Sequence, residues 1–283
     1  MIYANREWSY EYTRMPSEFS EEVVQKVTSR MLVRYSKITK EWSSDRNSEW
    51  LCRTYLAAKL IMQATLTVNS MLYAKERNLR VVVPYLKYYS ALSLMRSVVL
   101  MLPEQSWNEG RIISLGHEKI LKLVVCHVAE FDKNAASSIE RKIRSLRASR
   151  ELISYRAPSS GDEAIPDVSE FLGLCALIAE IAQFDSELLE VSLNKNSDPK
   201  YFELISDYLY ELSNVSIGPH TFGDNEDAYR LDYFKRKQPH MVNIRFLMRE
   251  GHVDDFFGAW SDSEDVNGAF DPDEMNGIIF DIQ

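Results

Sequence analysis

The amino-acid sequence predicts an all-α protein. Apolar residues recur at steps of three and four along most of the chain, cap residues, Gly and Pro separate these segments, and strand-type alternation is nearly absent. The chain has 283 residues, of which 45% are hydrophobic and 27% charged. This composition excludes collagen-like, disordered and disulfide-scaffold proteins, and the length is sufficient to bury a continuous core.

The first half of the chain contains three predicted helices. Residues 1–15 are rich in aromatic side chains and lack a helical period. Pro16 opens a helix that runs to about Ile38, and a long helix follows over residues 47–78. Pro84 suits the first turn of the next helix, which is almost entirely apolar as far as Leu102 and is therefore expected at the centre of the core.

The second half continues in the same way after Pro103. A cap at Ser114 or Gly116 begins a helix that ends near Phe131. The further predicted helices are a basic one over 134–155, an apolar one from Pro166 or Asp167 to about Leu193, one over 199–213, and one over 224–249 that Pro239 disturbs.

The helices define four segments along the chain. They are an N-terminal extension with one helix (1–44), a central helical bundle (45–195), additional helices (196–250) and an acidic, aromatic tail (251–283). The tail contains nine acidic residues and no Lys or Arg, so it accounts for the whole net charge of −9. It also repeats a short pattern, EDVNGAFD and then DEMNGIIFD, whose Asn-Gly pairs predict turns or hairpins.

The cysteines and the N-terminus indicate a cytoplasmic protein. Cys52, Cys126 and Cys175 show no C-x-x-C spacing and lie in apolar contexts, which predicts reduced core residues. The first residues do not form a signal peptide, and no apolar stretch reaches the roughly 20 residues of a membrane helix.

Most well-known catalytic and ligand-binding motifs are absent. The sequence has no Walker A loop, no G-x-G-x-x-G, no H-E-x-x-H and no G-x-S-x-G, and its five histidines show no metal spacing. Asp271 and Asp273 begin like a calcium loop, but Met275, Asn276 and Ile282 occupy three of its required positions. We therefore expect neither a metal nor a cofactor, and we interpret these residues as a solvated acidic tail.

The basic helix is the most informative stretch. Arg141, Arg144, Arg147 and Arg150 recur every three residues, and Arg156 follows. Guanidinium groups in a row suit phosphate oxygens, so these residues are candidates for RNA or phosphate binding. The alternative is a solvated face whose arginines pair with nearby carboxylates.

Three stretches resemble the HEPN superfamily, whose helical domains occur in toxin–antitoxin modules, antiviral defence proteins and RNA-processing enzymes. PYLKYYSALSLMRSVVL from Pro84, which contains Tyr88 and Tyr89, resembles the second core helix of the family. GHEKIL from Gly116 resembles the start of its third helix, and LRASRELISYR from Leu146 resembles its signature helix. The resemblance covers residues 45–195 and implies a HEPN-like bundle.

Active members of the family carry an Arg, four to six residues and then a His, and this pair cuts RNA without metal. Here Arg150 and four intervening residues lead to Tyr155, so the spacing is kept while the His is replaced. Tyr has an unperturbed pKa of about 10 and is a poor base at neutral pH, whereas that of His is about 6.5. The resemblance implies an endoribonuclease with Tyr155 in place of His, or a non-catalytic branch; His117 is a further candidate base.

The resemblance also implies partners and a role. We expect an RNA-directed component of a bacterial defence or toxin–antitoxin system that binds or cuts RNA, and a homodimer in which two signature helices face one another. The acidic tail then docks a protein partner or lies on the arginines and restrains RNA binding. Two alternatives stand beside this function: a non-catalytic helical scaffold of a larger complex, and a module that binds a nucleotide or another small molecule.

Overall fold

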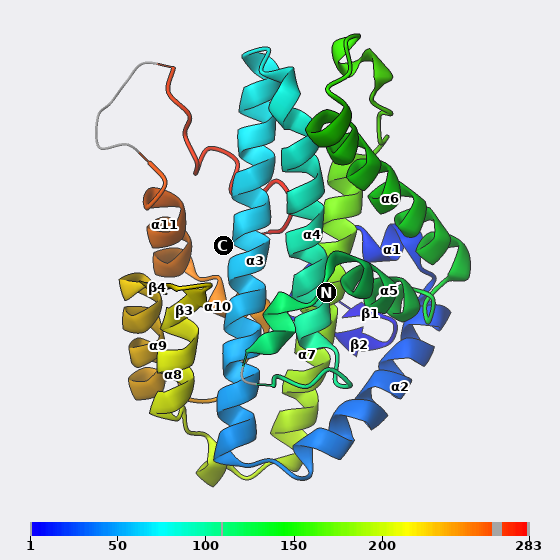
Figure 1. The fold of residues 1–283 in the computed structure, drawn as a ribbon. Coiled ribbons are helices and arrows are strands. Elements are labelled where there is room, and N and C mark those ends of the chain that lie inside the picture. The colour runs from blue at the N-terminus through cyan, green and yellow to red at the C-terminus, as the bar shows by residue number, and fades with distance from the viewer. Residues whose placement is uncertain (1, 109, 262–267, 282–283) are drawn as a thin grey trace.

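The computed structural model describes residues 2–108, 110–261 and 268–281 and is mostly helical, as the sequence predicts. Two long helices, α3 (Ser44–Glu76) and α4 (Val83–Met101), run side by side through the middle of the bundle (Figure 1). The Ser43 side chain caps α3 by accepting a hydrogen bond from the Arg46 backbone N–H. Because α4 has few polar positions, most of its side chains are buried, which confirms its predicted central place.

The N-terminal and central segments surround this pair. Helix α7 (Phe171–Asn196) packs against α4, and α2 (Glu21–Thr39) packs against α7. Helices α5 (His117–Val128) and α6 (Lys133–Arg156) cover another side of α4 (Figure 1). Short 3-10 turns connect several of these elements, at Arg80–Val82, Arg111–Ser114, Gly161–Ala164 and Pro199–Tyr201.

The C-terminal helices lie along α3 on the far side from α6 (Figure 1). They are α8 (Ser206–Ser213), α9 (Asn225–Lys237), α10 (Ile244–Leu247) and α11 (Glu250–Gly258). The prediction of a single helix over 224–249 is wrong in its second half. Helix α9 ends before Pro239, because proline lacks the N–H that a helix interior needs.

The chain also forms two short antiparallel hairpins, although the sequence predicted almost no strands. The first pairs β1 (Ile2–Tyr3) with β2 (Arg6–Glu7), and the second pairs β3 (Asn214–Ile217) with β4 (His220–Gly223). The second hairpin occupies part of the connection between α8 and α9.

Two buried carboxylates of α7 hold the N-terminal segment in place. Glu187 accepts hydrogen bonds from the backbone N–H groups of Ser9 and Tyr10. Glu180 accepts hydrogen bonds from the N–H groups of residues 13–15, where α1 (Met15–Glu18) begins. A carboxylate at this point satisfies donors that the first turn of a helix cannot pair internally.

The described part of the acidic tail is docked. Tyr73 on α3 donates a hydrogen bond to the Gly268 carbonyl, and the Phe280 ring stacks on Tyr10 with 4.3 Å between ring centroids. Residues 268–281 contain turns but no strand, and much of the first copy of the repeat lies outside the described residues. In its described part the tail lies against α3 and the N-terminal segment, and not on the arginines of α6.

The cysteines only partly follow the sequence prediction. Cys52 and Cys175 are buried free thiols in the core, whereas Cys126 is exposed on α5. Among the helices that the structure describes, none combines the length and the apolar character needed to cross a membrane.

Candidate functional site

Side chains from α4, α5 and α6 meet around His117. Gly116 is the N-cap of α5, so His117 is the first residue of this helix. The Tyr88 hydroxyl on α4 lies 2.9 Å from His117 Nδ1, and the Arg150 guanidinium on α6 lies 5.3 Å from the Tyr88 ring centroid. Arg147 is one helical turn before Arg150 and therefore lies on the same side of α6. We call Tyr88, Arg96, His117, Arg147 and Arg150 the His117 cluster.

Burial and the charges of the cluster together keep His117 neutral. Partial burial lowers the pKa of His117, and the positive charges of Arg96, Arg150 and Arg147 lower it further. The ring is therefore unprotonated at neutral pH. In the tautomer that carries its proton on Nδ1, this nitrogen donates to the Tyr88 oxygen and leaves Nε2 as a proton acceptor.

Tyr88 has the properties of an orienting group. Its side chain is buried, and burial raises the pKa of Tyr88, so the hydroxyl keeps its proton. Tyr89, the next residue, is 43% exposed, and its ring contacts the Tyr88 ring and also lies beside His117. The two adjacent tyrosines thus have separate places, one in the core and one on the surface.

Arg96 is the member of the cluster that no sequence pattern singles out. It lies on α4, two turns after Tyr89, and burial lowers the pKa of its guanidinium. Within the described residues, Arg96 has no carboxylate at ion-pair distance, and the Nε atoms of Arg96 and Arg150 are buried without a hydrogen-bond partner. Such unpaired buried donors are available to an anion.

The outer arginines of α6 are largely paired with carboxylates. Arg144 lies 2.8 Å from both Glu118 and Glu140. Arg147 lies 2.8 Å from Glu151 and 3.4 Å from Glu118. This part of the basic helix therefore resembles the solvated, carboxylate-paired face that the sequence left open. Glu151 is also the nearest carboxylate to Arg150, at a longer 3.6 Å.

Arg150 and Tyr155, the pair expected from the sequence, do not converge. Five residues along an α-helix correspond to a rotation of about 140°, so the two side chains leave α6 in different directions. Tyr155 is 73% exposed near the end of the helix. Arg141 and Arg156 are also exposed, and among the described residues neither has an ion-pair partner.

A second charged cluster lies deeper, at the other end of α5. His127 is buried, with Nε2 2.8 Å from Asp185 on α7 and Nδ1 3.9 Å from Glu130. Burial opposes protonation of His127, but these two carboxylates outweigh it and raise the pKa of His127 to about 9. Interaction with His127 and with Arg34, 2.8 Å away, lowers the pKa of Glu130 to about 2. His127 and Asp185 are enclosed in the core, whereas Arg34 and Glu130 are partly exposed, and together the four side chains connect α2, α5 and α7.

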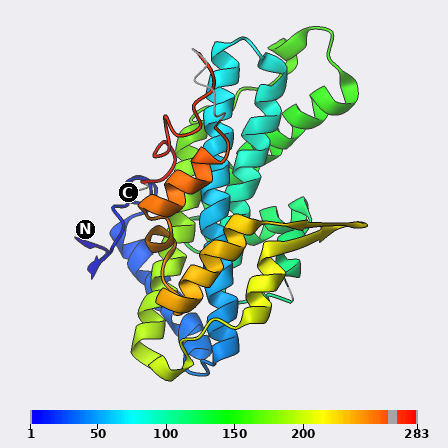
Figure 2. The ribbon, with the colours of Figure 1, turned by 90° about the vertical axis from the view of Figure 1, so that its left-hand side faces the viewer.

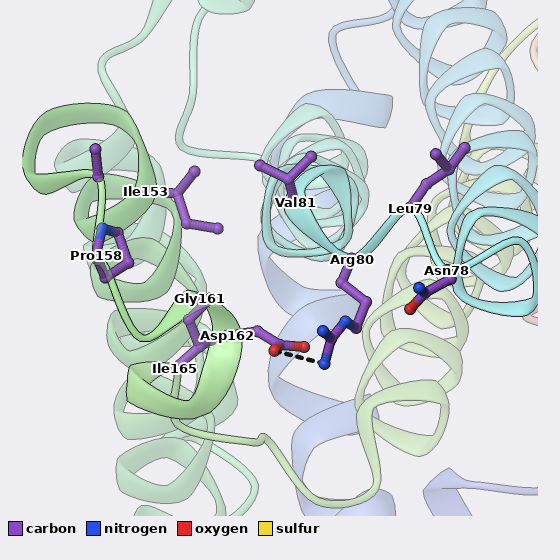
Figure 3. Close-up of a pocket in the computed structure, with 10 residues that line it drawn as sticks. Asn78, Leu79, Arg80, Val81, Ile153, Pro158, Gly161, Asp162 and Ile165 are labelled. Atoms are coloured by element: carbon purple, nitrogen blue, oxygen red, sulfur yellow. Dashed lines mark ion pairs between the residues drawn. The ribbon is translucent and has the colours of Figure 1, made fainter.

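A separate pocket of about 540 Å³ opens at one end of the bundle (Figure 3). The turn between α3 and α4 provides one wall, with Leu79 and Val81, and Ile153 and Pro158 provide the other. Its two charged side chains, Arg80 and Asp162, pair with each other at 2.9 Å. The pocket therefore offers an apolar surface and no unpaired charge to a ligand.

No group of three or more His, Cys, Asp or Glu side chains within the described residues is arranged to hold a metal ion. Comparison of the chain with protein-family models, curated proteins and solved structures gives no match. The HEPN resemblance therefore rests on the sequence motifs alone.

Proposed function

We propose that the protein binds RNA at the His117 cluster and cleaves it without metal, with His117 as the general base. One observation carries the proposal: a neutral histidine, hydrogen-bonded through Nδ1 to the buried Tyr88, is surrounded by three guanidinium groups. A neutral imidazole can accept a proton at pH 7, and guanidinium groups stabilise the negative charge of a phosphate.

The chemistry follows from these roles. His117 Nε2 removes the proton of an RNA 2′-hydroxyl, and the 2′-oxygen forms a bond to the adjacent phosphorus. The bond from phosphorus to the 5′-oxygen breaks, and that oxygen takes a proton from water. Arg147 and Arg150 hold the phosphate oxygens, whose charge increases in the transition state. The products are a 2′,3′-cyclic phosphate and a 5′-hydroxyl, and this scheme replaces Tyr155 by His117 as the base.

The exposed ring of Tyr89 favours RNA over free phosphate as the ligand of this site. Its exposed ring lies beside His117, with 6.5 Å between the ring centroids. An aromatic ring next to a phosphate site can stack on the base of an unpaired nucleotide, and such stacking tolerates all four bases. We therefore expect single-stranded RNA with little sequence preference.

The proposal is tested by incubating the full-length protein with a labelled single-stranded RNA in the presence of EDTA. We expect cleavage that His117→Ala abolishes and that a 2′-deoxy nucleotide blocks at its own position. His240→Ala is the matched control, because His240 lies outside the cluster and its pKa is likewise lowered by burial. Equal cleavage by His117→Ala and wild type would contradict the proposed base, as would cleavage at the 2′-deoxy position.

The biological role implied by the resemblance is part of the same proposal. If the chain is the RNA-cutting component of a bacterial defence or toxin–antitoxin system, producing it in a bacterial host should arrest growth, and His117→Ala should relieve the arrest. Growth unaffected by the wild-type protein, in cells whose RNA the purified protein cuts, would point to a different role.

The second candidate function is a non-catalytic scaffold that binds another protein. The pairing of Arg144 and Arg147 with three glutamates favours it, since paired guanidinium groups attract RNA less strongly. A protein that neither cuts RNA nor binds it in a salt-sensitive way would support the scaffold.

A further inference from the structure

A cavity of about 270 Å³ lies where the N-terminal segment meets the C-terminal helices. Its lining residues are Ser9, Asn243, Arg245, Phe246 and Arg249, and we call it the Arg245 cavity. Figure 2 shows α10 and the start of α11 beside the N-terminal segment, and Arg245 Nη1 joins the two by donating a hydrogen bond of 2.8 Å to the Ser9 carbonyl. The C-terminal helices lie on the far side of α3 from α6, so this cavity is separate from the His117 cluster.

The two arginines of the cavity have no counter-charge. Within the described residues, neither Arg245 nor Arg249 has a carboxylate at ion-pair distance. Arg245 Nε is also buried without a hydrogen-bond partner. Buried polar groups are rarely left unpaired, because an unmade hydrogen bond of a charged group costs free energy. An orphaned guanidinium N–H beside a cavity therefore points to a ligand that carries acceptor oxygens.

Two carboxylates of α7 approach this region, but both already accept hydrogen bonds. Glu190 accepts one of 2.7 Å from Asn243 Nδ2, and Glu187 accepts those of the Ser9 and Tyr10 backbone N–H groups. No Asp or Glu of the described residues lines the cavity itself. The two guanidinium groups therefore give the cavity a net positive charge.

The polar groups of the cavity are held in place by the protein. The hydrogen bond to the Ser9 carbonyl fixes Arg245, and the Arg249 guanidinium carbon lies 3.4 Å from the centroid of the Phe246 ring. The Ser9 hydroxyl accepts a hydrogen bond of 3.4 Å from Asn243 Nδ2 and donates none within the part of the chain that the structure describes. Because these groups are ordered in advance, a ligand loses less free energy in ordering them.

We propose that the Arg245 cavity binds the phosphate group of a small phosphate monoester. Such a group carries nearly two negative charges at neutral pH, which two guanidinium groups neutralise, whereas a carboxylate carries only one. The planar guanidinium also matches the spacing of phosphate oxygens. The volume of 270 Å³ is just below the usual range of ligand pockets, about 300–1,000 Å³, so the cavity accommodates a phosphate group with a small substituent.

The test is isothermal titration calorimetry of the full-length protein with glycerol phosphate and with inorganic phosphate, at about pH 8, where both are dianions. We expect both to bind and acetate to bind at least about tenfold more weakly. Arg245→Gln and Arg249→Gln should each raise the dissociation constant of glycerol phosphate by at least about tenfold, because each removes charge-assisted hydrogen bonds.

Two further arginine variants are the controls. Arg236→Gln removes the same charge from α9, where Arg236 pairs with Asp232, and should leave the dissociation constant unchanged. Arg150→Gln removes it from the His117 cluster and should also leave it unchanged. Helical circular dichroism checks the folding of each variant. Arg249→Gln keeps the test decisive if Arg245→Gln does not fold, because Arg249 makes no hydrogen bond to the N-terminal segment within the described residues.

Four outcomes would overturn the proposal. They are a wild-type protein that binds neither phosphate at millimolar concentrations, binding that survives in both Arg245→Gln and Arg249→Gln, binding lost in Arg150→Gln instead, and acetate that binds as tightly as glycerol phosphate. Binding of inorganic phosphate without glycerol phosphate would likewise contradict a monoester and assign the cavity to the free ion. No RNA is present in the titration, so its result and that of the cleavage test are independent.

Discussion

Helix α5 carries a histidine near each end, and the two have opposite electrostatic surroundings. His117 faces three arginines at the surface, and burial together with their charge lowers its pKa. His127 faces Asp185 and Glu130 in the core, and these carboxylates raise its pKa to about 9 despite its burial. At neutral pH the first is a neutral base and the second a cation.

The comparison shows that neighbouring charges decide the role of a histidine more than its helix or its burial. Both side chains lose solvation, which by itself favours the neutral ring in both places. The arginines of α4 and α6 add to this effect at His117, whereas the carboxylates reverse it at His127. One helix thereby carries a proposed catalytic base and a structural ion pair.

Reversing the charge beside His117 should have the largest effect. Arg150→Glu gives His117 a carboxylate neighbour like that of His127 and removes one stabilising group from the phosphate, so we expect RNA cleavage to fall by roughly 10²–10³-fold. Lys133→Glu makes the same charge change at the exposed start of α6 and is the control. Comparable losses of kcat/KM in both variants would mean that net charge, and not the cluster, determines activity.

Removing the carboxylate beside His127 should destabilise the fold. Asp185→Asn leaves a buried histidine without its closest counter-charge, and we expect a loss of about 3–5 kcal/mol in the free energy of unfolding. Urea denaturation measures the change, with Glu22→Gln as the control, because the ion pair of Glu22 with Lys26 is exposed. A urea midpoint for Asp185→Asn equal to that of the wild type would show that the pair contributes nothing.

The stability of the protein should decrease as the pH rises from about 6.5 to about 9. In this window His127 is deprotonated in the unfolded chain and still protonated in the folded one, so its contribution is complete below 6.5 and lost through 9. Urea midpoints across the window give the slope. In Asp185→Asn the slope should flatten, because burial without this carboxylate favours the neutral ring; an equally steep slope would assign the effect to another group.

Removing the hydroxyl of Tyr88 should have the smallest effect. Tyr88→Phe eliminates the oxygen that accepts a hydrogen bond from His117 Nδ1, which corresponds to a loss of roughly three- to tenfold in kcat. Tyr89→Phe retains its exposed ring and should leave kcat unchanged. If the two variants behave identically, the hydrogen bond between His117 and Tyr88 does not orient the histidine.

The sequence predicts the helices better than the site. The helix predicted over 47–78 is observed at 44–76, and the basic one predicted over 134–155 is observed at 133–156, because caps and apolar periods are local properties. The hairpin at 214–223 was missed, since its strands are four residues long and the alternation is brief. Pairing of strands so short depends on the turn as much as on their composition.

The His117 cluster required information that local patterns do not contain. The sequence singles out Arg147 and Arg150 on the basic helix, and Tyr88 and Tyr89 as an adjacent pair. Whether these residues meet His117 depends on how α4, α5 and α6 pack. Tyr88 and His117, for example, are 29 residues apart in the sequence. The spacing that favoured Tyr155 is a sequence property, whereas the direction of a side chain on the helix is a geometric one.

The central claim is that the two histidines of α5 have pKa values displaced in opposite directions. Titration of the full-length protein by NMR, following the imidazole C–H resonances with His117→Ala and His127→Gln for assignment, measures both in one experiment. We expect His117 to titrate below 6.5 and His127 near 9. A His117 resonance that titrates above 6.5, or a His127 resonance that titrates below it, would contradict the account.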